Sequence, residues 1–299
     1  MPGSLFHILE HKEAPLMRPH VEVIQQADLI QHDAEFPRAD GGAWQRNLSY
    51  DEEIGAASIR VHLEPGWKRP MGYHHAITEW YVLDGGIEID GREYGRGTYW
   101  RAPIGMVVPE IRSAKGADLL VYREAGDYGF TVADRGLDDA EDDWTCMNGD
   151  GMEWLPVAKE GPAPGLFIKM LHQHPVTRAY SRLIWAAPGW VDHRLAHHPC
   201  SEEAYTLSGS MVYNFGDLYE GVYFYRPAWV KHGHFVSGEP SGCTWLIRSD
   251  GELTNLYTGH NEVIREEEAL NYDPTSQRPV LAGIPVRSRS MGEWSLDGQ

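Results

Sequence analysis

The sequence predicts an all-β protein that folds as two similar barrels. Its apolar residues come in short, mostly alternating runs, such as SIRVHLEP and EAYTLSGSMVYNF, bounded by Gly, Pro, Asp and Asn. Such runs are typical of short antiparallel strands in a sandwich or barrel. The same order of runs and turn residues occurs twice along the chain. Only His20–Asp33 and Asn261–Leu270 have a helical pattern, so we expect few, short helices that flank the barrels.

An internal repeat supports the division into two units. Pro65-Gly66-Trp67 recurs as Pro188-Gly189-Trp190, and His74-His75 recurs as His197-His198, both 123 positions later. Matches that keep their order along the chain indicate a duplication. Single residues match at a displacement of 124: Gly97 with Gly221, Tyr99 with Tyr223 and Pro103 with Pro227.

The repeat predicts two domains. The repeated cores cover about 45–130 and 170–255. We therefore expect an N-terminal barrel with an arm and a connection in residues 1–150, and a C-terminal barrel with a C-terminal arm in residues 151–299.

The composition favours a cytoplasmic protein that binds small molecules. A formal net charge of −18, from 26 Lys and Arg against 44 Asp and Glu, would repel nucleic acids and anionic lipid surfaces. No segment approaches the roughly 20 apolar residues of a membrane span, and the first residues lack the apolar stretch of a signal peptide. The 3 cysteines are too few for a disulfide framework. Exposed sheet edges and terminal arms favour a homodimer.

The second unit carries two histidines and a glutamate in the pattern of a metal site. His198 precedes Glu202 by four positions, and His232 ends the segment PAWVKH. Side chains two apart on a strand share a face, and the residue two before His198 is Ala196. The set therefore reduces to His198, Glu202 and His232. Two histidines and one carboxylate with open positions form the facial triad of non-haem Fe(II) oxygenases.

Three further histidines are candidates for a fourth metal ligand. His193 is near in sequence, His197 would need a bulge to turn inward, and His234 shares the face of His232 if its strand continues. Each could equally form a hydrogen bond to a ligand without touching the metal.

These residues resemble the motifs of the cupins, the RmlC-like jelly-roll superfamily. The first cupin motif is HxH followed by Glu and Gly, and His198, Glu202 and Gly209 match its latter part. The second is PxGxxH, which residues 227–232 match with Trp229 in place of glycine. The segments GTYWRAPIG and GVYFYRPAWVKHG are similar to the anti-sigma-factor (ChrR-like) type, which includes acetylacetone-cleaving dioxygenases.

The resemblance covers both units and implies two double-stranded β-helix barrels in one chain, a bicupin. It implies one divalent metal ion, Fe(II) in the first place and Zn, Mn, Ni or Cu as alternatives. It further implies a dioxygenase that acts with O2 on a small chelating carbonyl, diketone or aromatic substrate. A redox-neutral isomerase or decarboxylase, and a non-catalytic metal- or ligand-sensing cupin, are the alternatives.

The first unit offers a weaker metal site. His75 and Glu79 have the same spacing as the histidine and glutamate of the second unit, and Glu110 could complete a site. Val108, however, occupies the position of the last histidine, and valine cannot bind a metal. A degenerate barrel kept for structure or dimerisation is therefore the expected state.

Aromatic and cationic residues of the second unit are expected to line a substrate pocket. Arg182 and Arg248 are further candidates to bind a carboxylate or enolate if they face inward. The sequence assigns no catalytic acid or base. The expected pocket residues are Tyr205, Tyr225, Arg226 and Trp229.

Overall fold

The computed structural model confirms an all-β fold. It describes residues 18–258 except 35, 52, 125–128, 141–143 and 158–164. The one helical element in that range is the 3-10 turn η1 (Gln26–Asp28). The helical expectation for His20–Asp33 is therefore wrong beyond this turn, and Asn261–Leu270 lies outside the described residues. Within the described chain, no helix has the length and apolarity needed to cross a membrane.

The first barrel consists of a ten-stranded and a three-stranded sheet. Its core is aromatic, with Trp67, Trp80 and Trp100 fully buried in one cluster. The larger sheet contains β2 (His32–Asp33), β3 (Ala43–Tyr50), β4 (Ala57–Leu63), β5 (Trp67–Arg69), β7 (Thr78–Ile89), β8 (Arg92–Gly95), β9 (Thr98–Ala102), β11 (Ile111–Ser113), β12 (Ala117–Arg123) and β14 (Thr145–Asn148). The smaller contains β6 (Gly72–His74), β10 (Val107–Val108) and β13 (Phe130–Val132).

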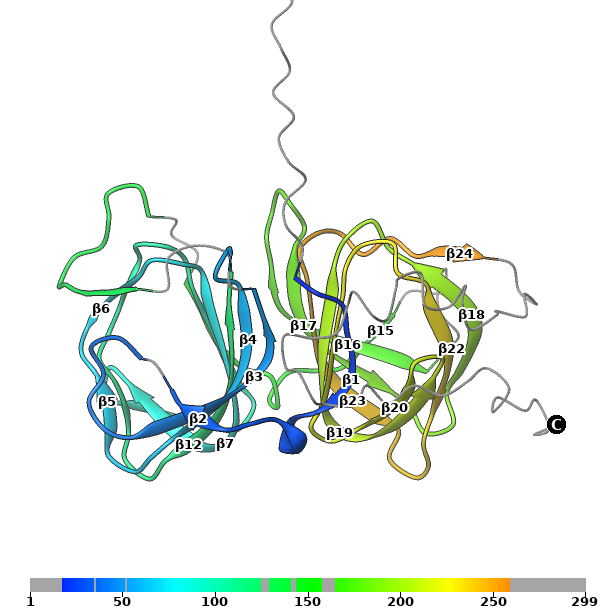
Figure 1. Ribbon diagram of the computed structural model, residues 1–299, viewed down its shortest axis with the longest axis horizontal. Coiled ribbons are helices and arrows are strands. Elements are labelled where there is room, and N and C mark those ends of the chain that lie inside the picture. The colour runs from blue at the N-terminus through cyan, green and yellow to red at the C-terminus, as the bar shows by residue number, and fades with distance from the viewer. Residues whose placement is uncertain are drawn as a thin grey trace, which may run out of the picture.

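The second barrel is an eleven-stranded sheet that lies beside the first (Figure 1). Its core cluster includes Ile184, Met211, Phe224 and Trp245. Its strands are β15 (Leu155–Pro156), β16 (Leu166–Gln173), β17 (Tyr180–Ala186), β18 (Val191–His197), β19 (Glu202–Tyr213), β20 (Gly216–Tyr219), β21 (Val222–Arg226), β22 (His232–Ser237), β23 (Cys243–Ser249) and β24 (Leu256–Thr258), together with β1 (Val21–Gln25).

Strand β1 joins the second barrel although it precedes the first in the sequence. It pairs antiparallel with β21, with Val21 opposite Tyr225 and Gln25 opposite Val222. Figure 1 shows this dark blue segment against the second barrel, with the chain then returning to the first. The N-terminal arm is thus a structural part of the barrel that carries the candidate metal residues.

The two barrels meet through a shared apolar cluster and a buried polar network. Tyr81 and Leu120 from the first barrel pack in one cluster with Leu183, Tyr223 and Leu246 from the second. The network crosses the same interface, and it is built from charged side chains that pair with one another. Its bonds include Arg248 Nη2 to Glu79 Oε1 at 2.9 Å, Arg248 Nη1 to Glu203 Oε1 at 2.5 Å, and Arg18 Nη2 to Glu203 Oε1 at 2.9 Å.

Candidate metal centre

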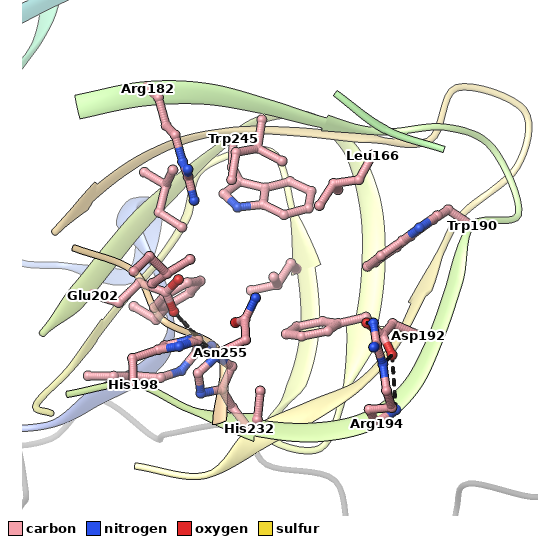
Figure 2. A pocket seen from close by; sticks show the side chains of 18 of the residues that line it. Leu166, Arg182, Trp190, Asp192, Arg194, His198, Glu202, His232, Trp245 and Asn255 are labelled. Carbon is pink, nitrogen blue, oxygen red and sulfur yellow. Dashed lines mark hydrogen bonds and ion pairs between the residues drawn. The ribbon is translucent and has the colours of Figure 1, made fainter. Parts of the chain in front are cut away.

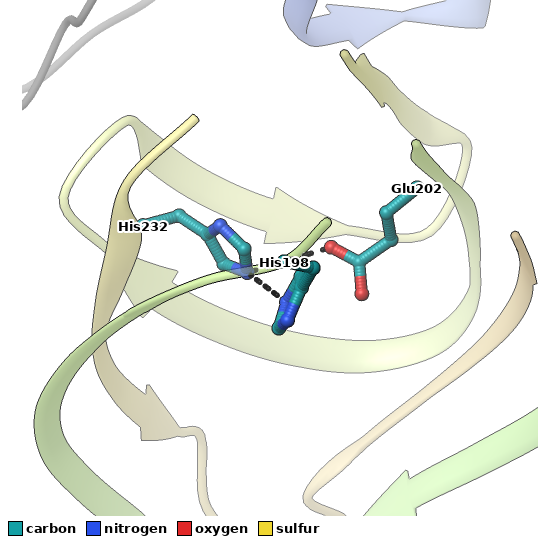
Figure 3. Close-up of side chains that lie close together, drawn as sticks. All are labelled: His198, Glu202 and His232. Carbon is teal, nitrogen blue, oxygen red and sulfur yellow. Dashed lines mark hydrogen bonds and ion pairs between the residues drawn. The ribbon is translucent and has the colours of Figure 1, made fainter. Parts of the chain in front are cut away.

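Three buried side chains converge at one end of the second barrel. His198 follows the last residue of β18, Glu202 begins β19 and His232 begins β22. The Nε2 atoms of the two histidines are 3.1 Å apart, and His232 Nε2 is 3.5 Å from Glu202 Oε2. One ligand atom from each residue lies within 4.8 Å of the others. Figure 3 shows the three side chains directed toward one another.

The two imidazoles are held in the form that binds metals. Burial lowers the pKa of His232 well below its usual range, and Arg226 lowers it further. Burial also lowers the pKa of His198. His198 Nδ1 lies 3.3 Å from the carbonyl of Thr254, and His232 Nδ1 lies 3.0 Å from that of Val230. A carbonyl only accepts, so the neutral tautomer with its proton on Nδ1 is the one that satisfies both of these contacts.

This tautomer leaves three acceptors facing one another. The lone pairs of both Nε2 atoms and a carboxylate oxygen of Glu202 point into one buried space, at the distances given above. Such an arrangement is electrostatically unfavourable unless a cation lies between the acceptors. The donor set of two imidazoles and one carboxylate fits a divalent metal such as Fe, Mn or Zn.

A charged network holds Glu202 in place. Arg226 Nη1 donates to Glu202 Oε2 at 2.8 Å, and Arg226 Nε donates to Glu22 Oε1 at 2.5 Å. Burial alone would raise the pKa of Glu22, but Arg226 and His20 outweigh it, so this carboxyl is ionised. Tyr213 also donates to Glu22. Glu202 is thus held in a network with Arg226, Glu22 and His20, and its Oε2 lies 3.5 Å from His232 Nε2.

Glu22 is a site residue that our sequence analysis missed. It lies on β1, and its side chain is buried in the second barrel 204 positions before Arg226. The available signal was the segment VEVIQ, whose valines and isoleucine favour a strand over the helix we expected. No local pattern indicates which barrel an N-terminal strand will join.

None of the expected fourth ligands lies in the cluster. His193 is exposed, and the ring of His197 packs against Trp229 with centroids 5.9 Å apart. His234 has left-handed backbone with φ of 56°, which breaks the alternation of β22. Phe235 lines the cavity in its place, so the inward positions of this strand are His232 and Phe235.

The register of the two barrels identifies the true counterparts of the metal residues. In the first barrel Gly72 pairs with Val108, and in the second Ala196 pairs with His232. Both pairs fit a displacement of 124, so His198 corresponds to His74. The displacement is 123 at Trp190 and 124 at Ala196, so the second barrel has one more residue between these positions. An irregularity in β18 between Asp192 and Leu195 accommodates this residue.

The weaker N-terminal candidates His75, Glu79 and Glu110 therefore do not form a metal site. The first barrel has Thr78 at the position of Glu202. Thr78 pairs with Ala102 just as Glu202 pairs with Arg226, and both residues of the second pair lie 124 positions later. The three proposed residues point to different places. His75 Nε2 bonds Thr131 Oγ1 at 2.8 Å, Glu79 pairs with Arg248 between the barrels, and Glu110 pairs with Arg112 at the surface.

His74 has an arginine where a metal would lie. Arg69 Nη2 is 2.9 Å from His74 Nε2, and both side chains are buried. Burial lowers the pKa of His74 well below its usual range, and the charge of Arg69 adds to this. Burial also lowers the pKa of Arg69, to about 9. With valine and threonine at the other two positions, the first barrel retains one of the three metal-binding side chains.

The three converging residues open onto a cavity of about 100 Å³ in the second barrel. Of the expected pocket residues, only Arg226 lines it. Tyr205 and Tyr225 lie in the cluster between the barrels, and Trp229 is 54% exposed. Alternation explains the error, because Arg226 faces inward and its neighbour Tyr225 must face outward. The walls shown in Figure 2 include Arg182, Trp190, Arg194, Trp245 and Asn255.

A family model matches residues 22–256, and the family is described as "Domain of unknown function (DUF4437)". The chain belongs to this family. No curated protein matches it.

Solved structures share its bicupin architecture. A crystal structure titled "putative dioxygenase" from Nostoc punctiforme aligns with a TM-score of 0.72 and 19% identity, covering 82% of this chain and 88% of that one. A mutant of the Bacillus subtilis oxalate decarboxylase aligns with a TM-score of 0.51 and 17% identity, covering 79% of each chain. The likeness at these identities shows a cupin-like fold with two barrels.

Proposed function

We propose that this DUF4437 protein is a mononuclear metal-dependent dioxygenase of the cupin type. His198, Glu202 and His232 would bind one divalent ion, Fe(II) in the first place. The observation that carries the proposal is the convergence of three buried acceptors, with both histidine protons directed to carbonyls, on a cavity. The substrate would be a small chelating carbonyl, diketone or aromatic molecule.

The protein's own residues have distinct tasks in this proposal. Three protein ligands leave coordination positions free, and a metal bound there would polarise chelating oxygens and admit O2. Arg226 and Glu22 fix the carboxylate of Glu202 in one orientation. The apolar walls around Trp190, Phe235 and Trp245 exclude water and limit the size of the substrate.

The oxygenase reaction is supported by the segments that resemble diketone-cleaving cupins and by the name of the Nostoc punctiforme structure. A redox-neutral reaction is the second candidate, because the fold is also that of oxalate decarboxylase. One fold supports many reactions, so the choice depends on assay.

Metal reconstitution tests the proposal directly. The full chain is stripped of metal and loaded anaerobically with Fe(II), Mn(II), Zn(II), Ni(II) or Cu(II), and the bound metal is quantified. We expect about one ion per chain, lost in His198→Ala and in His232→Ala because each removes one of only three ligands. His75→Ala, a change in the other barrel, is the control and should retain the ion.

Oxygen uptake with a panel of β-diketones then separates the reactions. Uptake that matches substrate loss supports the dioxygenase. Substrate loss without uptake replaces it with a redox-neutral enzyme, and bound metal without any turnover favours a sensor. A correctly folded chain that takes up none of the metals would falsify the metal proposal as a whole.

A further inference from the structure

Three arginines line the cavity beside the candidate metal residues, and two of them are neutralised by protein carboxylates. Arg226 is bonded to Glu202 and Glu22. Arg194 forms a two-pronged pair with Asp192, through Nε to Oδ1 and Nη2 to Oδ2, both at 2.8 Å. Neither guanidinium therefore has its charge available for a ligand.

Arg182 differs from the other two. It lies on β17, and no carboxylate in the described part of the chain forms an ion pair with it. Its Nε is buried without a hydrogen-bond partner, and its guanidinium lies over the ring of Tyr180, 4.1 Å from the centroid. A cation with unused donors on a cavity wall is a binding element for an anion.

The surroundings of Arg182 define what such an anion can be. Figure 2 shows Arg182 directed into the cavity from the wall opposite His232, with Asn255 projecting into the space between. The cavity of about 100 Å³ admits a small molecule, on the order of ten heavy atoms.

We propose that Arg182 binds the carboxylate of a small organic acid whose carbonyl or hydroxyl oxygens face His198, Glu202 and His232. This inference rests on the proposed function for the metal half of the site and adds the substrate class. The planar guanidinium can donate two parallel hydrogen bonds to a carboxylate. The apolar walls would contact the carbon skeleton.

A pair of probes that differ in one group tests this. Acetylacetone and 2,4-dioxopentanoate share the β-diketone, and only the second carries a carboxylate. Binding of each is measured by calorimetry to the full chain, both metal-free and loaded anaerobically with Mn(II). We expect the wild-type chain to bind 2,4-dioxopentanoate about tenfold to a hundredfold more tightly than acetylacetone, the range of charge-assisted hydrogen bonds.

Substitutions assign the preference to one residue. Arg182→Gln should abolish the preference for 2,4-dioxopentanoate. Arg182→Lys should retain part of it, because lysine keeps the positive charge but cannot donate two parallel hydrogen bonds. The matched control is the double substitution Asp192→Asn with Arg194→Gln: it removes a guanidinium of the same cavity together with the carboxylate that neutralises it, and should leave the preference intact.

The outcomes separate this inference from the metal proposal. A preference that depends on Arg182 in a chain that takes up no metal supports the carboxylate site and overturns the metal function. Bound metal with equal affinity for the two probes, or a preference that survives in Arg182→Gln, overturns the carboxylate site alone.

Discussion

Trp229 has backbone that normally belongs to glycine. Its φ is 73°, in the left-handed region that costs a side-chain-bearing residue about 1–2 kcal/mol, and it stands where the cupin motif has glycine. Its backbone N–H donates to the carbonyl of His198 at 2.8 Å. The left-handed turn therefore hydrogen-bonds the loop before His232 to the backbone of His198. The indole ring of Trp229 is largely exposed and is not needed for this hydrogen bond.

Two substitutions separate the backbone from the ring. Trp229→Ala and Trp229→Gly both remove the contact with His197, but only glycine relieves the left-handed strain. We expect the glycine variant to have a free energy of unfolding about 1 kcal/mol higher than the alanine variant. Urea denaturation of both chains measures this difference. An alanine variant as stable as the glycine variant would show that the strain is absent.

Residue spacing was sufficient for the central part of the candidate site and insufficient for its surroundings. The four-residue step from His198 to Glu202 and the motif ending in His232 group residues that the structure brings together. Alternation from Glu202 also places Tyr205 outward, a signal we did not apply. The left-handed backbone of His234 and the pairing of Arg226 with Glu22 are different, because they depend on backbone irregularity and on a distant strand.

At the scale of single elements, β1 connects the N-terminal arm to the candidate metal centre. The strand adds a carboxylate that neutralises Arg226 and so lets Glu202 keep its charge for a cation. His20, which immediately precedes β1, bonds the same carboxylate through Nε2 at 3.0 Å. The arm is therefore expected to influence metal affinity although none of its residues is a ligand.

Glu22→Gln tests the role of β1. Without the negative charge of Glu22, Glu202 is the one carboxylate that pairs with Arg226. The negative charge that Glu202 offers to a metal ion is then reduced. We expect the Mn(II) affinity of the full chain to drop about tenfold or more, the usual effect of residues that orient a ligand. Calorimetric titration with Mn(II) measures it. Asp28→Asn, which removes an exposed carboxylate of the same arm, should leave the affinity unchanged.

At the scale of the whole molecule, the two barrels are joined by charge as well as by apolar contact. Burial raises the pKa of Glu203, but Arg18, Arg248 and hydrogen bonds from Ser58 and Tyr223 outweigh it and lower that pKa to about 2. The duplicated sequence predicted two barrels; it could not predict this network, because its members come from both halves and from the arm.

The depressed pKa of Glu203 predicts acid sensitivity of the interface. Its stabilisation is fully present above the pKa of an unfolded glutamate, about 4.3, and is lost as the pH falls toward the folded value. The total is about 3 kcal/mol by linkage, and part of it is lost between pH 5 and pH 3. Unfolding free energies across this range should decline less steeply in Glu203→Gln than in the wild type. Parallel slopes would contradict the assignment to this carboxyl.

The pairing of β1 with β21 also sets an order of events at the ribosome. Val21 emerges long before Tyr225, its partner in the ladder, and about 200 residues must be synthesised between them. At a synthesis rate of about 5–20 residues per second, roughly 10–40 s pass between the synthesis of β1 and that of its partner strand β21. The first barrel can close during that interval, whereas the second cannot acquire Glu22 until β21 has been synthesised. A strand that is made before the first barrel is thus placed only after that barrel's own sequence is complete.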